Sequence, residues 1–165
     1  RVVDKCEADE VTELIKALAE KHHVPRSNIA YDADGLGSYL RGYLRGAKPF
    51  NNGGSPLAVV RKSSKKYEIK INYKNLKSQC GYELARVIRQ GECGIEDKNL
   101  DKNAVKQELE QLQSHALDTE GRVQLKPKKL IKRDIGRSPD HLDALIMRAY
   151  FNLLPKYRKA KATTA

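Results

Sequence analysis

The chain has 165 residues, of which 39% are hydrophobic and 32% are charged, so it can fold around a core without a disulfide framework or a structural metal. No apolar run approaches the ~18 residues needed to span a bilayer. Cys6, Cys80 and Cys93 lack the CxxC spacing of a zinc knuckle, and the formal net charge of +11 favours a polyanionic partner, most commonly a nucleic acid.

The first part of the chain predicts two helices with a strand between them. Residues 7–21 carry apolar side chains at helical spacing, with acidic residues at the start and a lysine at the end. Residues 28–33 form a short apolar run bounded by turn residues, which predicts a buried strand. Residues 36–46 predict a second helix despite their glycines. Helix, strand, turn and helix in this order indicate an α/β fold.

The middle of the chain is irregular before it becomes helical. Residues 47–73 contain a turn-rich loop, a run at 57–60 that could form a strand, and a basic stretch at 62–70 that we expect to be mobile. Residues 74–90 then carry a strong apolar stripe at helical spacing. Cys80 falls on this stripe, which predicts a small core residue in a reducing environment.

Another helix, a turn and a basic stretch follow. Residues 101–115 predict a helix with Asp101 as its N-cap. Residues 118–125 resemble a turn with a short strand after it, and residues 126–133 are rich in lysine and arginine.

The last predicted helix has the clearest start. Ser138 is the candidate N-cap, and Pro139 takes the first helical position, where its missing N–H costs nothing. We expect residues 1–155 to form one domain and residues 156–165 to form a basic, disordered tail.

Two acidic clusters suggest a metal site. Asp32 and Asp34 follow the predicted strand directly, at the end where ligand sites form in α/β sheets. Asp140 and Asp143 lie three residues apart on the last helix. Each cluster also has a structural explanation, because aspartates favour turns and the first turn of a helix. Together with a basic surface, clustered carboxylates favour a nuclease that binds Mg²⁺ or a similar hard cation.

Basic side chains just before the last helix are the candidates for contacts with a DNA backbone. An ordinary basic loop explains the same residues equally well. The candidates are Lys126, Lys128, Lys129, Lys132 and Arg133, and Lys65, Lys66 and Lys70 form a second, weaker patch.

Three segments resemble, in order, the C-terminal nuclease domain of the large terminase subunit of tailed bacteriophages. They are "YDADGLGSYL", "NYKNLKSQCGYELARVI" and "GRVQLKPKKLIKRDIGRSPDHLDAL", within residues 28–153. The resemblance implies a ribonuclease-H-like, RuvC-like fold, a mixed sheet flanked by helices. It also implies an endonuclease that cuts concatemeric viral DNA during packaging, using two divalent ions, Mg²⁺ or Mn²⁺.

The same resemblance implies partners and site residues. The partners are double-stranded DNA, the ATPase domain of the same parent chain, the portal and the small terminase subunit, in the cytoplasm of an infected or lysogenic bacterial host. Asp32 matches the family's central-strand acid, and Asp34, one pleat further, is a weaker candidate. Asp140 matches the last-helix acid, and Asp143 falls where the resolvases carry a further acid.

One departure from the family concerns the first strands. The family carries an acid on its first strand, before the first helix, whereas here only "RVVDK" precedes that helix. Asp4 resembles the end of the third strand instead. We therefore expect the first strands to be lacking, the metal site to be incomplete, and cleavage to be weak or absent. The alternative function is a non-catalytic DNA-binding or assembly module that keeps the fold.

Overall fold

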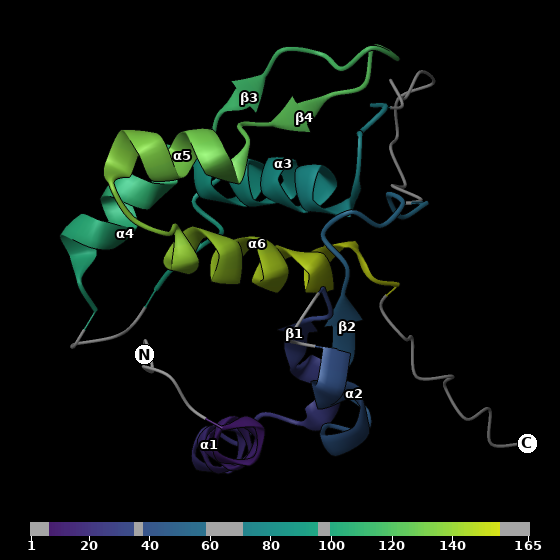
Figure 1. Cartoon of the computed structure of the whole chain (residues 1–165), viewed down its shortest axis with the longest axis vertical. Coiled ribbons are helices and arrows are strands. Elements are labelled where there is room, and N and C mark those ends of the chain that lie inside the picture. The colour runs from purple at the N-terminus through teal and green to yellow at the C-terminus, as the bar shows by residue number, and fades with distance from the viewer. Residues whose placement is uncertain (1–6, 35–37, 59–70, 96–99, 156–165) are drawn as a thin grey trace, which may run out of the picture.

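The computed structural model describes residues 7–34, 38–58, 71–95 and 100–155, and these form a mixed α/β structure (Figure 1). Its elements in chain order are α1 (Ala8–Lys21), the 3₁₀ turn η1 (Arg26–Asn28), β1 (Ala30–Asp32), α2 (Leu40–Tyr43), β2 (Lys48–Phe50), α3 (Leu76–Arg89), α4 (Lys102–Leu109), β3 (Ser114–His115), β4 (Gln124–Leu125), α5 (Lys128–Ile135) and α6 (Asp140–Leu153). Within these ranges, no helix has the length and apolar character required to cross a bilayer.

The main core lies between α3 and α6, which pack side by side (Figure 1). The apolar stripe predicted for residues 74–90 is confirmed on α3. Cys80 and Leu84 of α3 are buried with Leu142 and Ile146 of α6, and Phe50 at the end of β2 joins the same cluster. Burial of each large apolar side chain contributes about 1.5–3 kcal/mol. Burial also raises the pKa of the Cys80 thiol to about 12, as expected of an unreactive core cysteine.

The parallel pair β1–β2 meets α6 at one side of this core. Tyr31 pairs in register with Pro49, and the last residue of β1, Asp32, pairs with Phe50. Tyr31 is buried against Leu40 and Leu44 on the other side of the strand. Asp32 therefore leaves the sheet at its carboxyl edge, where β1 contacts α6.

The start of α3 is capped by the loop that follows β2. The N–H groups of Leu76 and Lys77 donate to the backbone carbonyls of Gly54 (2.7 Å) and Asn52 (3.2 Å). The next N–H, that of Ser78, donates to the side chain of Asn75 at 2.9 Å. Each of these N–H groups would lack a partner within the helix, so the loop fixes where α3 begins.

The start of α6 is capped from another helix. Pro139, rather than the predicted Ser138, is the N-cap, and it offers no side-chain acceptor. The buried Glu108 of α4 instead accepts the N–H of Leu142 at 2.8 Å and forms an ion pair with Arg137. Ser138 donates its hydroxyl to Asp140 at 2.7 Å. The sequence prediction was wrong here because the acceptor comes from a distant segment.

Several predicted elements differ from the structure. The predicted helix at 101–115 keeps its Asp101 cap, which accepts the N–H of Ala104 at 3.0 Å, but it ends at Leu109. Residues 114–115 instead pair antiparallel with residues 124–125. The basic stretch at 126–133 contains most of helix α5, which sequence reasoning missed.

Other expectations concern shorter or undescribed segments. The second helix spans only Leu40–Tyr43, and residues 57–58 are not in a strand. The expectations for residues 59–60, for 62–70 with Lys65, Lys66 and Lys70, for Asp4 and for the tail at 156–165 lie outside the described residues.

The Glu108–Arg137 pair should stabilise the fold measurably. Arg137→Met leaves a fully buried carboxylate without its guanidinium partner. We expect the free energy of unfolding in urea to fall by about 2–3 kcal/mol, below the range for fully buried pairs because Arg137 is partly exposed. The control is Arg148→Met, an exposed residue that donates only to Asn152. Equal losses in the two variants would contradict this role of Arg137.

Candidate metal centre

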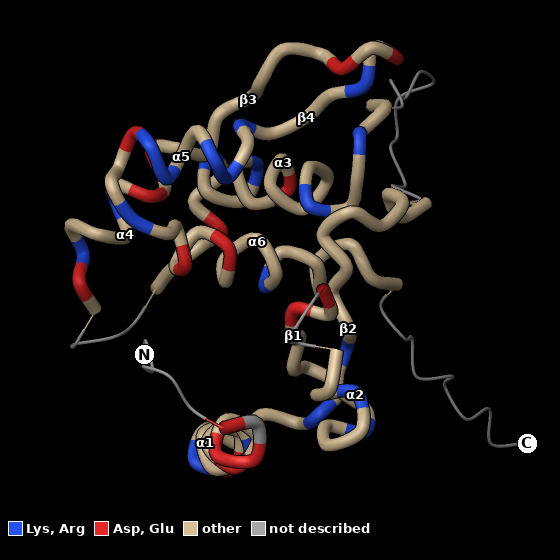
Figure 2. Tube along the Cα trace, in the orientation of Figure 1, with Lys and Arg blue, Asp and Glu red and all other residues tan. Residues whose placement is uncertain are grey.

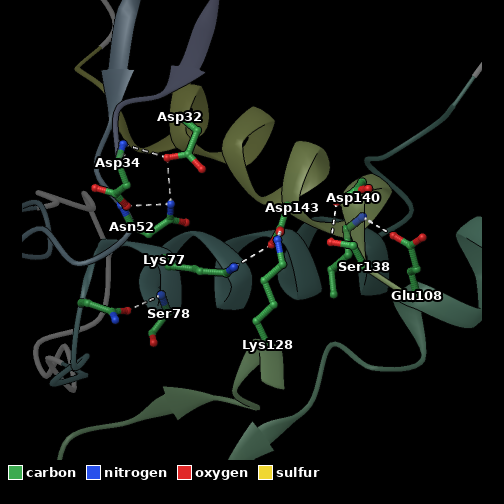
Figure 3. A network of polar contacts seen from close by, with 12 residues as sticks. Asp32, Asp34, Asn52, Lys77, Ser78, Glu108, Lys128, Ser138, Asp140 and Asp143 are labelled. Atoms are coloured by element: carbon green, nitrogen blue, oxygen red, sulfur yellow. Dashed lines mark hydrogen bonds and ion pairs between the residues drawn. The ribbon is translucent and has the colours of Figure 1, made fainter. Parts of the chain in front are cut away.

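Asp32 lies at the end of β1 and presents its carboxylate toward α6 (Figure 3). Its Oδ1 accepts two hydrogen bonds, from the backbone N–H of Asp34 at 3.0 Å and from Nδ2 of Asn52 at 3.1 Å. No hydrogen bond from the described residues reaches its Oδ2. One oxygen of this exposed carboxylate is therefore fixed by the protein, and the other is free to bind a ligand.

Asp34 is tied to the same asparagine. Its Oδ2 accepts from both the backbone N–H of Asn52 (3.0 Å) and the side-chain Nδ2 (2.9 Å). Sequence reasoning missed Asn52. This residue lies just after the end of β2, and Asp32 lies at the end of the neighbouring strand β1. The carboxyl ends of parallel strands share one sheet edge, so predicting β2 would have placed Asn52 beside the acids.

Asp143 lies on α6 between two lysines. Lys77 of α3 contacts Oδ1 and Lys128 of α5 contacts Oδ2, each at 2.6 Å. The Asp143 side chain is 22% exposed. Burial acts to raise its pKa, but the hydrogen bonds and charges of Lys128 and Lys77 outweigh burial and leave the pKa lowered. Asp143 is therefore a half-buried anion that the protein already neutralises with its own cations.

The ammonium group of Lys128 lies within electrostatic range of three of the predicted ligands. Burial acts to lower its pKa, but the hydrogen bond to Asp143 and the charges of Asp143, Asp140 and Asp32 outweigh this and raise the pKa. Figure 3 shows Asp143 between Asp32 and Asp140 in this view, with Lys128 reaching it from below. Lys128 thus has the position and charge of a cation shared among these carboxylates.

Asp140 occupies the first position of α6, one turn before Asp143. It is exposed and accepts the Ser138 hydroxyl. Figure 3 places it on the side of Glu108, away from the Asp32–Asn52 group. Of the two helix acids, Asp143 is the one that lies on the side of Asp32 in this view.

The donor chemistry of Asp32 and Asp143 fits a hard divalent cation, because both offer carboxylate oxygens. The described part of the chain nevertheless contains no group of three Asp, Glu, His or Cys side chains close enough to hold a metal. The structure joins Asp32 to Asp34 through Asn52, and it does not gather all four predicted aspartates in one cluster. Among the described residues, the predicted aspartates therefore remain candidates for a metal site and do not form a complete one.

The five basic residues predicted to contact DNA have different surroundings. Lys126 is only 15% exposed and contacts Gln111 and Asp134, while Lys128 binds Asp143. Arg133 is exposed but pairs with Asp134. In the described ranges, only Lys129 and Lys132 of the five are exposed without a carboxylate partner. Lysines and arginines gather along α5 in Figure 2, so this helix is the basic surface nearest to Asp143.

The lowered pKa of Asp143 predicts a specific loss of stability in acid. Its folded pKa lies below the unfolded value of about 3.9, so the folded state binds its proton more weakly. Its contribution is therefore present above about pH 3.9 and is lost as pH falls through the folded pKa. Melting temperatures measured from pH 5 to pH 2 should fall less steeply for Asp143→Asn than for the wild type.

The matched control for this measurement is Asp140→Asn, which makes the same charge change on the same helix. The partner of Asp140 in the described residues is a hydroxyl, not an ammonium group. If Asp140→Asn reduces the fall in melting temperature from pH 5 to pH 2 as much as Asp143→Asn does, the two lysines are not the cause of the effect.

Comparison with solved structures identifies the fold. The chain is similar to the nuclease domain of the large terminase subunit of bacterial virus Sf6, with a TM-score of 0.60 and 21% identity over 87% of this chain and 73% of that chain. A mutant of that domain with manganese and beta-thujaplicinol matches with a TM-score of 0.62 and 20% identity, over 88% of this chain and 74% of that chain. A mutant with calcium matches with a TM-score of 0.58 and 21% identity, over 84% of this chain and 70% of that chain.

No protein family and no curated protein matches the chain by sequence. The predicted fold class is confirmed by the structural comparisons: the chain has the ribonuclease-H-like α/β fold of a terminase nuclease domain.

Proposed function

We propose that the chain is the nuclease domain of a phage DNA-packaging terminase and that it cuts double-stranded DNA by metal-assisted phosphodiester hydrolysis. The observation that carries this proposal is the placement of Asp32 at a strand end beside α6 and its Asp143, within the fold of such a domain. The Sf6 domain structures with manganese and calcium support the use of a divalent cation in this proposal.

The proposed roles follow from the geometry. Asp32 offers its free Oδ2 and Asp143 its carboxylate to a divalent ion, Mg²⁺ or Mn²⁺, and Asp140 is the candidate ligand for a second ion. Such ions activate a water and stabilise the leaving oxygen of a phosphodiester. Asp34 accepts two hydrogen bonds from Asn52 through one oxygen, which leaves it the weakest candidate of the four aspartates.

Lys77 and Lys128 have a second role in this proposal. Both hold Asp143 while no divalent ion is bound, and both are long, flexible side chains. When an ion takes over the charge of Asp143, the two ammonium groups become available beside the site. They can then hold the scissile phosphate, with Lys129 and Lys132 of α5 contacting the DNA backbone further along.

The wider setting is proposed from the same likeness. The partners are the ATPase domain of the parent chain, the portal and the small terminase subunit, and the location is the cytoplasm of the bacterial host. The substrate is concatemeric viral DNA.

A plasmid assay tests the catalytic proposal. The chain should nick supercoiled plasmid slowly with Mn²⁺ and not with EDTA, because two carboxylates alone make an incomplete site. Asp32→Asn and Asp143→Asn should each lower the nicking rate by more than about 100-fold, beyond the range for residues that only support a ligand. Asp9→Asn, an exposed change on α1, is the control.

The second candidate function is a non-catalytic DNA-binding module. It is favoured by the absence, within the described ranges, of a cluster of three metal-binding side chains. It predicts DNA binding without cleavage in Mn²⁺, and no change in either property for Asp32→Asn. Slow nicking that Asp32→Asn abolishes would exclude it.

A salt titration tests the proposed DNA surface. Lys129→Ala with Lys132→Ala should weaken binding to a labelled duplex and reduce the slope of log affinity against log salt by about 2, close to one per phosphate contact. Arg41→Ala with Arg45→Ala removes the same charge near α2, at the other end of the molecule in Figure 1. Equal slopes for the two double variants would show that α5 is not the DNA surface.

A further inference from the structure

We propose that Asn52 is a positioning residue that selects which oxygen of Asp32 binds the metal, and that Asp34 acts through Asn52 and not as a ligand. This inference rests on the proposed metal-dependent function. Neither role is visible in the sequence, where Asn52 belongs to the turn-rich segment "NNGG".

The side-chain amide nitrogen of Asn52 carries two N–H groups, and two different carboxylates accept from it. Nδ2 donates to Asp32 Oδ1 at 3.1 Å and to Asp34 Oδ2 at 2.9 Å (Figure 3). A primary amide can donate no further hydrogen bonds from this nitrogen. The orientation of the amide is therefore set by the two aspartates.

Hydrogen bonds to one oxygen leave the other for a metal. Asp32 Oδ1 accepts from Asn52 and from the N–H of Asp34, while Oδ2 accepts none from the described residues. Two donors on Oδ1 hold the carboxylate plane and occupy that oxygen. In the proposed site, Asp32 would therefore hold a cation through Oδ2.

Asp34 completes a closed ring of hydrogen bonds. The N–H of Asp34 donates to Asp32, and the Oδ2 of Asp34 accepts from the side-chain nitrogen of Asn52. The same nitrogen of Asn52 also donates to Asp32. The backbone N–H of Asn52 adds a second bond to Asp34 Oδ2. Asp34 therefore holds Asn52 in place, which explains a second aspartate at this position without making it a metal ligand.

The backbone of Asn52 links the strand acid to the helix acid. Its carbonyl accepts the N–H of Lys77 in the first turn of α3, at 3.2 Å. The side chain of the same lysine binds Asp143 at 2.6 Å. Asn52 thus contacts both Asp32 and the start of α3, and Lys77 of α3 binds Asp143. The strand acid and the helix acid of the proposed site are therefore both linked to Asn52.

The neighbouring asparagine shows what an ordinary turn residue does in this loop. Asn51 Oδ1 accepts the N–H of Gly53 at 3.0 Å, a local bond that closes the turn. The Asn52 side chain makes no hydrogen bond of this local kind. Its partners lie 20 and 18 residues away, in the acidic segment after β1. The pair Asn51 and Asn52 therefore offers a matched comparison.

The test compares Asn52→Ala with Asn51→Ala in the whole chain. Binding of Mn²⁺ is measured from the electron paramagnetic resonance signal of the free ion, and folding from thermal melts in EDTA. Asn52→Ala should weaken Mn²⁺ binding by about 10- to 100-fold, the usual cost of losing a residue that orients a ligand. Asn51→Ala, which loses a turn bond, should bind Mn²⁺ as the wild type does.

Two substitutions of Asp34 distinguish a residue that holds Asn52 in place from a metal ligand. Asp34→Asn keeps an oxygen that can accept from Asn52, so it should bind Mn²⁺ far better than Asp34→Ala. If Asp34 is itself a ligand, both substitutions should lose affinity as Asp32→Asn does.

The outcomes distinguish this inference from the proposed function. If Asn52→Ala binds Mn²⁺ as tightly as Asn51→Ala while Asp32→Asn loses binding, the metal site stands and the role of Asn52 is wrong. Equal loss in Asp34→Asn and Asp34→Ala overturns the role given to Asp34. If the wild type binds no Mn²⁺, or if Asp32→Asn binds it unchanged, the metal site fails and the positioning role fails with it.

Discussion

The half-buried carboxylate of Asp143 requires compensating positive charge, and the arrangement of three helices follows from how the protein supplies it. An unpaired charge removed from water costs several kcal/mol. Here Lys77 approaches from α3 and Lys128 from α5, so the charge on α6 draws both neighbours toward it. The apolar contacts between α3 and α6 give the main stabilisation. The ion pairs add direction, because they fix which residues of α3 and α5 face Asp143 on α6.

The same helix, α6, serves the core and the candidate site, and this couples stability to function. Leu142 is buried and donates its N–H to Glu108, while Asp143, the next residue, faces the lysines. A shift of α6 would disturb the core and the site together. The proposed binding of a divalent ion at Asp143 would require less, because only two flexible lysine side chains would have to move. The backbone can therefore stay rigid while the charge at the site is exchanged.

Local sequence patterns predicted the parts of the fold that depend on local periodicity. The helices at α1, α3 and α6 and the strand at β1 follow from apolar spacing. The candidate aspartates stood out by residue type, but the sequence could not separate Asp143 from Asp140. The strand β2 has three residues and contains a proline, so no pattern marked it. The charged composition of α5 obscured its helical period. The short strand expected within residues 118–125 is present as β4, but its partner β3 was predicted as part of a helix. Lys77 and Asn52 escaped prediction because their partners are 66 and 20 residues away.

The charge balance of the candidate site bears on how many ions it can hold. Asp32, Asp34, Asp140 and Asp143 are not gathered in one cluster, but this region as a whole, with Lys77 and Lys128, carries two net negative charges, which equal the charge of one divalent ion. A second ion would make the site positive unless new negative charge arrives. Each DNA phosphate brings one such charge, and it also attracts the two lysines away from Asp143. Under the proposed function, a second ion would therefore be favoured only with DNA in place, and full assembly of the catalytic centre would wait until the substrate is bound.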